Sequence, residues 1–392
     1  MTGVTIERIE LRLISMELVS PFQTSFGVEL ERPCIIISVH GEGLTGWGEC
    51  VAAQGIPEPG SENWAFYSYE TTETAWHILN DFLVPVLVGR RVESAAEVVA
   101  LGERLRGHPM ARAGLEAAVW DLLAQAQGLP LADLLAGNGR YATKRRDRAN
   151  VGVSIGIQPS IEATIQAVDG YVAEGYGRIK LKIKPGWDVE MVRAVRREFP
   201  DILLMVDANS AYTLEDAASL KQLDEFNLLM IEQPLAYDDI YEHSLLQAQL
   251  ETAVCLDESI HTPKQAEWSY EINACRIINI KPGRVGGLWA GREIHDLSLA
   301  RDKPVWCGGM LETGIGRAAN VALASLPNFT LPSDISASDR YYRKDIVDPP
   351  FVLNPDSTLS VPENVGLGVR VNQERLAAVT YRQSVIAAKT LK

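Results

Sequence analysis

The sequence predicts an α/β protein: a (β/α)8-type barrel that follows an N-terminal α+β unit. Two observations favour this fold class. From about Asn150 onward, short apolar runs alternate with amphipathic segments about eight times, which is typical of a parallel sheet covered by helices. Before that point, strand-like runs are followed by helical patterns. An open doubly wound sheet is the alternative, although no GxGxxG motif follows the first strand and no GxxxxGK[ST] motif occurs.

The N-terminal unit begins with strands and continues with helices. Val4–Leu18 alternates roughly between polar and apolar residues, Cys34–His40 is rich in β-branched residues, and Gly41–Gly46 is typical of a hairpin connection. The clearest helical pattern covers Ala111–Ala126 and ends before Gly128–Pro130. We therefore expect an antiparallel sheet that packs against helices.

The barrel segment contains a series of short apolar runs separated by amphipathic patterns such as Ile161–Glu174 and Val189–Glu198. The predicted strands are Val151–Ile155, Arg178–Ile183, Ile202–Val206, Leu228–Ile231, Ala253–Leu256, Arg276–Ile280 and Pro304–Cys307, with a weaker one near Phe329. The expected limits are residues 1–147 for the α+β unit and 148–345 for the barrel. Residues 346–392 return to short strands and turns, and we expect them to pack back on the N-terminal unit.

The composition narrows the possible partners. The chain has 37 Lys and Arg against 51 Asp and Glu, a formal net charge of −14, which argues against nucleic acid and anionic membranes as partners. Its five scattered cysteines form no CxxC pair, and the charged N-terminus does not resemble a signal peptide. No apolar run approaches the ~20 residues of a membrane span. We expect a cytoplasmic protein that forms a homo-oligomer and acts on a small molecule.

Five charged residues follow successive predicted strands at an even spacing. The intervals between Lys182, Asp207, Glu232, Asp257 and Lys281 are 25, 25, 25 and 24 residues. An Asp after a strand is often only a helix cap, and a Lys on an alternating strand is usually solvated. Their joint regular spacing instead indicates one rim of the barrel, the carboxyl ends of the strands, where barrel enzymes carry out chemistry.

The order of these charges suggests a mechanism. Three adjacent carboxylates would repel each other unless a cation lay among them, and hard oxygen ligands on rigid strands suit Mg²⁺. Zn²⁺ is disfavoured because no His lies at these strand ends. Lys182 and Lys281 lie on opposite sides of the carboxylates in barrel order. They could remove or deliver a proton on either face of the carbon next to a substrate carboxylate, with the metal stabilising the enediolate.

At these residues the sequence resembles the enolase superfamily, in its muconate-lactonizing subgroup. Within that subgroup it is similar to the o-succinylbenzoate synthase / N-succinylamino acid racemase (N-acylamino acid racemase) family, and the similarity spans nearly the whole chain. The segments that carry the resemblance are Arg178–Asp188, Asp207–Thr213, Ile231–Leu235, Leu256–Ser259 and Trp306–Arg317 in the barrel, with Pro21–Gly27 and Met110–Glu116 in the capping region. The general pairing of a Lys or His base with Mg²⁺ is well known for enolase-superfamily sites.

The resemblance implies a role for each matching residue. Asp207, Glu232 and Asp257 would bind Mg²⁺, for which Mn²⁺ or another divalent cation can substitute. Lys182 and Lys281 would be the acid/base pair. Lys180 would help to hold the substrate carboxylate, and Asn209 would orient a ligand or the substrate. Glu258 points the other way on an ideal strand, so it is expected to support the metal ligands from outside or to cap a helix.

The resemblance also implies a capping domain that closes over the barrel. Phe22, Thr24, Phe26 and the polar stretch from Gly55 to Thr72 are the candidates for the lid. Such residues often only pack against their neighbours, so contact with substrate is one of two possibilities. The further candidates for substrate contact are Ser154 and the backbone of Gly308, Gly309 and Met310.

Two activities fit this pattern equally. One is dehydration of 2-succinyl-6-hydroxy-2,4-cyclohexadiene-1-carboxylate to o-succinylbenzoate, a step toward menaquinone, and the other is racemisation of N-succinylamino acids. A mandelate-type site is disfavoured because no His occupies the place of Lys281. Dipeptide epimerase activity is disfavoured because Asp334 lacks the second Asp of the ammonium clamp, which is Ser336 here. Muconate cycloisomerase activity, a Schiff-base barrel enzyme and an inactive barrel used as a binding protein are the remaining alternatives.

Overall fold

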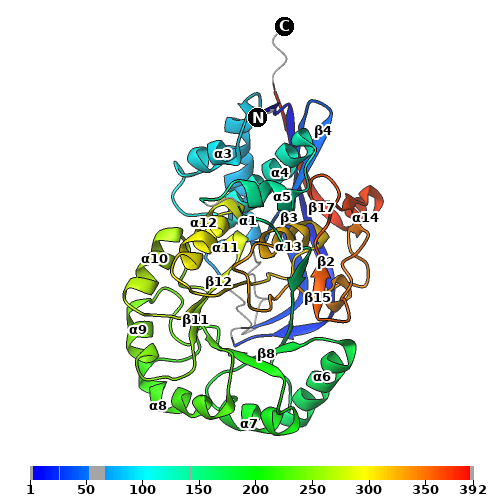
Figure 1. The fold of residues 1–392 in the computed structure, drawn as a ribbon. Coiled ribbons are helices and arrows are strands. Elements are labelled where there is room, and N and C mark those ends of the chain that lie inside the picture. The colour runs from blue at the N-terminus through cyan, green and yellow to red at the C-terminus, as the bar shows by residue number, and fades with distance from the viewer. Residues whose placement is uncertain (1–2, 26, 53–66, 141–142, 389–392) are drawn as a thin grey trace.

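The computed structural model describes residues 3–25, 27–52, 67–140 and 143–388. Figure 1 shows two parts: a ring of parallel strands with helices around it, and an antiparallel sheet with its own helices at one end of that ring. The predicted fold class is confirmed. Among the residues described, no helix is both long enough and apolar enough to span a membrane.

In the described residues the barrel wall is a sheet of seven parallel strands whose spatial order follows the chain. They are β7 (Val153–Ile155), β8 (Arg178–Lys182), β9 (Leu203–Asp207), β10 (Ile231–Glu232), β11 (Val254–Leu256), β12 (Ile277–Ile280) and β13 (Val305–Cys307). One segment contacts both edges of this sheet. Ser333 forms a parallel bridge with Val151, and Asp334 N donates to Cys307 O at 2.8 Å. The closure therefore lies a few residues beyond Phe329, which is buried and stacks on His295.

Most of the observed strands lie within the predicted runs or end one residue beyond them. The prediction of Leu228–Ile231 is wrong at its start, because strand pairing begins only at Ile231. Leu229 N still donates to Leu204 O at 2.8 Å, so the earlier residues run beside β9 without forming a regular ladder.

Helices cover the outside of the barrel. Two of them, α6 (Ile161–Glu174) and α7 (Val189–Glu198), have the predicted limits. Ser160 caps the start of α6 by accepting Ala163 N, and Gly175 ends it with φ at +104°. The others are η2 (Leu214–Asp216), α8 (Ala217–Leu220), η3 (Lys221–Phe226), α9 (Tyr241–Gln247), α10 (Pro263–Glu271), α11 (Pro282–Val285), α12 (Leu288–Leu299), α13 (Gly314–Ala324) and η4 (Ser338–Arg340).

The N-terminal part is built on an antiparallel sheet in the order β17-β2-β3-β4. Its strands are β2 (Arg8–Gln23), β3 (Val28–Gly41), β4 (Leu44–Cys50) and β17 (Thr380–Ala387). The C-terminal strand β17 pairs with β2, so the end of the chain adds an edge strand to the sheet that the start of the chain began. The long helix α4 (Pro109–Gln127) packs on β3 and β4.

Short elements complete both parts. They are β1 (Val4–Thr5), α1 (Thr72–Ile78), η1 (Leu79–Leu83), α2 (Val84–Leu87), β5 (Arg91–Val92), α3 (Ala95–Gly102), α5 (Leu131–Gly137), β6 (Arg148–Asn150), β14 (Val347–Asp348), β15 (Thr358–Ser360), β16 (Arg370–Val371) and α14 (Gln373–Val379).

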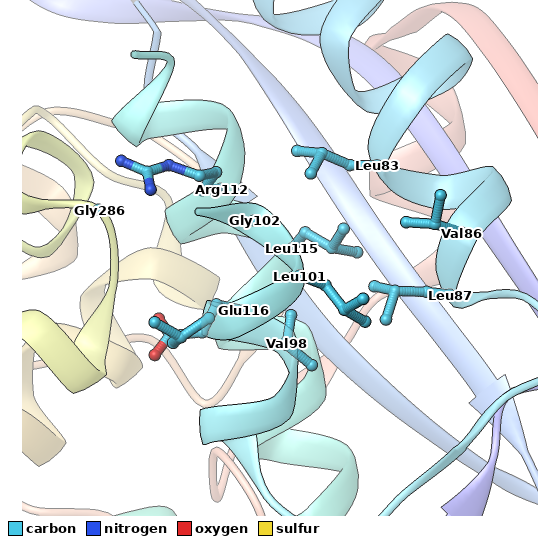
Figure 2. A pocket seen from close by; sticks show the side chains of 11 residues that line it. Leu83, Val86, Leu87, Val98, Leu101, Gly102, Arg112, Leu115, Glu116 and Gly286 are labelled. Carbon is cyan, nitrogen blue, oxygen red and sulfur yellow. The ribbon is translucent and has the colours of Figure 1, made fainter. Parts of the chain in front are cut away.

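Buried glutamates of the N-terminal part cap helices of the barrel. Glu116 of α4 accepts Leu288 N at 2.7 Å and Trp289 N at 2.8 Å, the first backbone donors of α12. Figure 2 shows Glu116 pointing toward the Gly286 segment, whereas Leu83, Leu87 and Leu115 gather on the other side of the helix. A Cβ on Gly287 would lie 1.8 Å from Glu116 Oε2, so this contact requires glycine.

A second buried glutamate makes the same kind of contact. Glu49 of β4 accepts Thr313 N at 3.1 Å and Gly316 N at 3.0 Å at the start of α13. Burial raises the pKa of both Glu49 and Glu116 to about 7, although their hydrogen-bond donors oppose the shift. Two carboxyl groups thus attach the N-terminal part to barrel helices that flank the open end of the strands.

Candidate active site

The five evenly spaced charged residues meet at one rim of the barrel. Lys182, Asp207 and Glu232 are the last residues of β8, β9 and β10, and Asp257 and Lys281 each follow their strand by one residue. The strand ladder pairs Lys182 with Asp207 and Asp207 with Glu232. All five side chains are buried. The regular spacing therefore does place these residues at one height.

On one side of the rim, Lys182 is bound by residues of the next strand. Its Nζ donates to Asp207 Oδ2 at 2.7 Å and to Asn209 Oδ1 at 2.6 Å. Asn209 Nδ2 donates in turn to Glu258 Oε1 at 2.9 Å. Glu258 faces the site because β11 already ends at Leu256, so the strand alternation that predicted the opposite direction no longer applies. Burial alone would raise the pKa of Asp207, but Lys182 and Lys180 hold it well below its usual range.

On the opposite side, Lys281 contacts the next carboxylate and a residue of the N-terminal part. Its Nζ donates to Asp257 Oδ2 at 2.7 Å and to Tyr67 Oη at 3.2 Å, and it lies 4.4 Å from the centre of the Tyr67 ring. Tyr67 Oη donates to Asp257 Oδ1 at 2.8 Å. Arg284 of α11 also pairs with Asp257 and donates to Ile260 O at 2.7 Å. Asp257 thus lies between one ammonium and one guanidinium group.

Lys180 occupies the centre of the site. Strand alternation places it on the same face as Lys182, and its Nζ lies 2.8 Å from Glu232 Oε2 and 3.0 Å from Asp207 Oδ2. Asn279 Nδ2 donates to the other oxygen of Glu232 at 2.6 Å. Burial and the neighbouring Asp207 raise the pKa of Glu232, and Lys180 opposes that shift.

The residues of the rim fit a hard divalent cation by their chemistry. Asp207, Glu232 and Asp257 offer carboxylate oxygens from consecutive strands, and the buried oxygens Glu258 Oε2 and Asn279 Oδ1 have no hydrogen-bond partner. In the arrangement shown, lysine ammonium groups neutralise the carboxylates. No three acidic, histidine or cysteine side chains among the described residues are arranged to chelate an ion. A cation would therefore compete with the lysines for the same oxygens.

A cavity of about 60 Å³ opens above the lysines. The predicted substrate contacts Phe22, Thr24, Ser154, Gly309 and Met310 all line it, as do Lys180, Lys182, Asn209 and Lys281. Ser154 Oγ donates to Asp334 Oδ2 at 2.9 Å, so its hydroxyl already has a partner. Phe26 and residues 55–66 of the expected lid lie outside the described residues.

Several residues of the site, Asn279 among them, were missed from the sequence as contributors to its chemistry. Arg284 follows Lys281 by three residues, and this spacing on a short helix was an available signal. Asp334 was considered only as part of an incomplete ammonium clamp, yet it accepts Lys180 Nζ at 2.5 Å. Tyr67 is separated by 214 residues from Lys281, and no local pattern predicts their contact.

The fold and the site define a class of protein: a parallel barrel with an N-terminal capping sheet, in which three lysines face three carboxylates at the strand ends. The family models agree with this class. The model of the mandelate racemase / muconate lactonizing enzyme N-terminal domain matches residues 8–136, and the enolase C-terminal domain-like model matches residues 163–375. The chain belongs to this family, which confirms the predicted resemblance.

Relatives with known names are similar over almost the whole chain. An o-succinylbenzoate synthase from Geobacillus kaustophilus is 48% identical over 379 residues, 96% of each chain. An N-succinylamino acid racemase from Amycolatopsis sp is 48% identical over 376 residues, 95% of this chain and 96% of the relative. The solved structure of an enolase-superfamily protein from Listeria innocua has a TM-score of 0.89 at 40% identity and covers 98% of this chain and 99% of its own.

Proposed function

We propose that this protein removes a proton from the carbon next to a substrate carboxylate and acts as an o-succinylbenzoate synthase, an N-succinylamino acid racemase, or both. The observation that carries the proposal is the placement of two buried lysines at opposite ends of a row of carboxylates. Lys182 contacts Asp207 at one end, and Lys281 contacts Asp257 at the other. The names of the relatives at 48% identity support both activities equally.

Asp207, Glu232 and Asp257 would hold Mg²⁺ or, in its place, Mn²⁺. When bound, the cation would stabilise negative charge that develops on the substrate carboxylate. The protein's own residues move the proton. In dehydration, Lys182 takes the α-proton and passes it to the departing hydroxyl, which leaves as water, while Lys281 stays charged and stabilises the anionic ring through a cation–π contact.

In racemisation the two lysines serve opposite faces of the same carbon. One lysine removes the α-proton of one enantiomer, and the other delivers a proton from the opposite side. Lys180 would face the substrate carboxylate, and Asn209 would hold the Lys182 ammonium in place through the 2.6 Å hydrogen bond.

The surroundings of Asp334 disfavour a substrate with a free ammonium group. Both oxygens of this carboxylate already accept from charged donors, since Arg178 Nη2 lies 2.6 Å from Oδ1 and Lys180 Nζ lies 2.5 Å from Oδ2. A third cation would have no free carboxylate to meet at this position. We therefore favour N-acylated amino acids over dipeptides. The homo-oligomer, the cytoplasmic location and the part of the lid outside the described residues remain predictions.

The test is metal removal followed by assay of both activities. Treatment with EDTA should abolish turnover, and Mg²⁺ or Mn²⁺ should restore it. Asp207→Asn, Glu232→Gln and Asp257→Asn should each weaken Mn²⁺ binding in calorimetry by about 10-fold or more. Asp345→Asn is the matched control, because Asp345 is equally buried but accepts Gly314 N and Ser338 Oγ away from the lysines. Full activity of metal-free protein would contradict the mechanism.

A further inference from the structure

In the part of the chain that the structure describes, Lys180 has three carboxylate partners, and only one of them lies outside the proposed cation site. Asp207 and Glu232 are proposed to bind the cation, whereas Asp334 comes from the segment that closes the barrel between β13 and β7. Asp334 Oδ2 is also the nearest of the three to Lys180 Nζ, at 2.5 Å. We propose that Asp334 is a positioning residue that fixes Lys180 as the cation at the floor of the substrate cavity.

Asp334 can fill this role because its own position is fixed on three sides. Arg178 Nη2 donates to Oδ1 at 2.6 Å and Ser154 Oγ donates to Oδ2 at 2.9 Å, while the backbone N–H of Asp334 donates to Cys307 O. Charge-assisted hydrogen bonds of this kind are short and directional. Burial would raise the pKa of Asp334, but Lys180 and Arg178 lower it well below its usual range, so the group is a carboxylate at neutral pH.

Arg178 is in turn held almost entirely by the backbone. Its guanidinium donates to the carbonyl oxygens of Val153, Pro332 and Ser333 at 3.2, 3.2 and 2.9 Å, and its side chain is fully buried. A Cβ on Gly152 would lie 2.4 Å from Arg178 Nε, so glycine is required for this close approach. Among the described residues, the guanidinium therefore has one charged partner, Asp334, and it cannot move away from it without losing several hydrogen bonds.

The ring of Trp306 supports both cations from inside the barrel. Its centre lies 5.0 Å from Lys180 Nζ and 5.7 Å from Arg178 Cζ, and its Nε1 donates to Cys255 Sγ at 3.3 Å. An aromatic face attracts a cation at this range. Lys180 is thus held by Asp334 and Trp306 in addition to Asp207 and Glu232, and it also lines the cavity.

The two lysines of β8, Lys180 and Lys182, therefore have different roles. The carboxylate and amide partners of Lys182 are Asp207 and Asn209, and no contact joins it to Asp334. If a cation binds Asp207 and Glu232, Lys180 still has the carboxylate of Asp334 as a partner, whereas Lys182 loses its only described carboxylate partner, Asp207. Lys180 would then remain a fixed positive charge for the substrate carboxylate and leave proton transfer to Lys182. This inference rests on the proposed function.

A double-mutant cycle of Asp334→Asn and Lys180→Met tests the proposal. In metal-loaded enzyme, Asp334→Asn should raise KM about 10-fold with a smaller fall in kcat, because the charge that meets the substrate is misplaced. In the Lys180→Met background, the same change should have less than about a 2-fold effect. A purely structural role predicts effects that multiply, and that result would overturn the proposal.

The cycle is repeated as thermal unfolding of metal-free protein, which needs no activity. The loss in Tm caused by Asp334→Asn should shrink by at least half when Lys180 is already Met. Ser154→Ala provides a milder variant if Asp334→Asn does not fold, and it should show a smaller effect that also disappears in the Lys180→Met background. Asp345→Asn is the control, and the loss in Tm that it causes should be the same with Lys180 or with Met at position 180. If the loss in Tm depends on Lys180 as expected but the wild-type protein turns over neither substrate, the Asp334–Lys180 contact is supported and the proposed function is rejected.

Discussion

The two proposed bases stand in different surroundings. Lys182 is bound by Asp207 and Asn209, which belong to the neighbouring strand β9 and the residues just after it. Lys281 is bound by Asp257 of the barrel and by Tyr67, a residue just before the first helix of the N-terminal part. The side-chain partners of Lys182 therefore come from the barrel, whereas Lys281 has one partner from the barrel and one from the capping region. We expect the two sides to respond differently to the same kind of substitution.

The largest difference should appear in dehydration, because loss of a proton and a hydroxyl from one face needs a single acid/base. Lys182→Ala should lower kcat by about 1,000-fold or more, since no other lysine can take its place. Lys281→Ala should also be severely impaired, but through lost electrostatic stabilisation. Lys281→Arg should recover part of that loss by keeping the positive charge, and Lys182→Arg should recover nothing. Steady-state assays of all four variants give the comparison, and an active Lys182→Arg enzyme would contradict it.

A smaller, side-specific effect is expected from the partners of the lysines. Tyr67→Phe removes the hydroxyl that lies 3.2 Å from Lys281 Nζ but keeps the ring beside it. Asn209→Ala removes the amide oxygen at 2.6 Å from Lys182 Nζ. The measurement is exchange of the substrate α-proton with D₂O, followed separately for each enantiomer. Each loss of a hydrogen bond to a charged group should slow the exchange catalysed by the lysine concerned about 10-fold, and the exchange catalysed by the other lysine less than about 3-fold. Equal slowing on both faces by either variant would show that the two sides are not separate.

The sequence predicted the barrel side of this site well. Lys182, Asp207 and Glu232 are strand-end residues, so their mutual position follows from strand order and spacing. The limits of α6 and α7 also followed from their amphipathic patterns, and in the structure Ser160 and Asp188 cap their first turns. Such features depend on neighbours within a few residues or on the regular repeat of strand and helix.

Contacts across the chain were beyond sequence reasoning. Tyr67 reaches Lys281 only because the N-terminal part docks on the barrel, and Asp334 reaches Lys180 only because the closing segment lies between β13 and β7. The start of β10 was misplaced because Leu228–Met230 is as apolar as a strand but does not form a regular ladder. Polar contacts of single residues carry no periodic signal, so their partners become visible only in three dimensions.

A third comparison concerns stability rather than catalysis, at the attachment of the capping part through Glu116. Burial raises its pKa from an ordinary value near 4.5 to about 7. The pKa of Glu116 is higher in the folded protein than in the unfolded chain, so protonation of this carboxyl stabilises the fold. This contribution to the free energy of unfolding is fully present below pH 4.5 and is lost as the pH rises through 7. Glu116→Gln lacks this titration but loses one acceptor for the N–H groups of α12. The variant should be less stable than the wild type at pH 5, and the difference should shrink by about 2 kcal/mol by pH 8.

Urea unfolding at four pH values between 5 and 8 measures this difference. Other groups also titrate in this range, such as His295 with its lowered pKa. Their contributions cancel when the free energy of unfolding of the variant is subtracted from that of the wild type at each pH. A difference that stays constant with pH would show that Glu116 is ionised throughout.

Lys182 and Lys281 are proposed to serve opposite faces of one carbon, and isotope exchange in variants that lack one of the two lysines distinguishes the faces. Each enantiomer of an N-succinylamino acid is incubated in D₂O with Lys182→Ala or with Lys281→Ala, and α-proton exchange and racemisation are followed by NMR and chiral chromatography. Lys281→Ala should exchange only one enantiomer and Lys182→Ala only the other, and neither should racemise its substrate. Exchange of the same enantiomer by both variants, or wild-type racemisation by either one, would contradict the assignment of the two lysines to opposite faces.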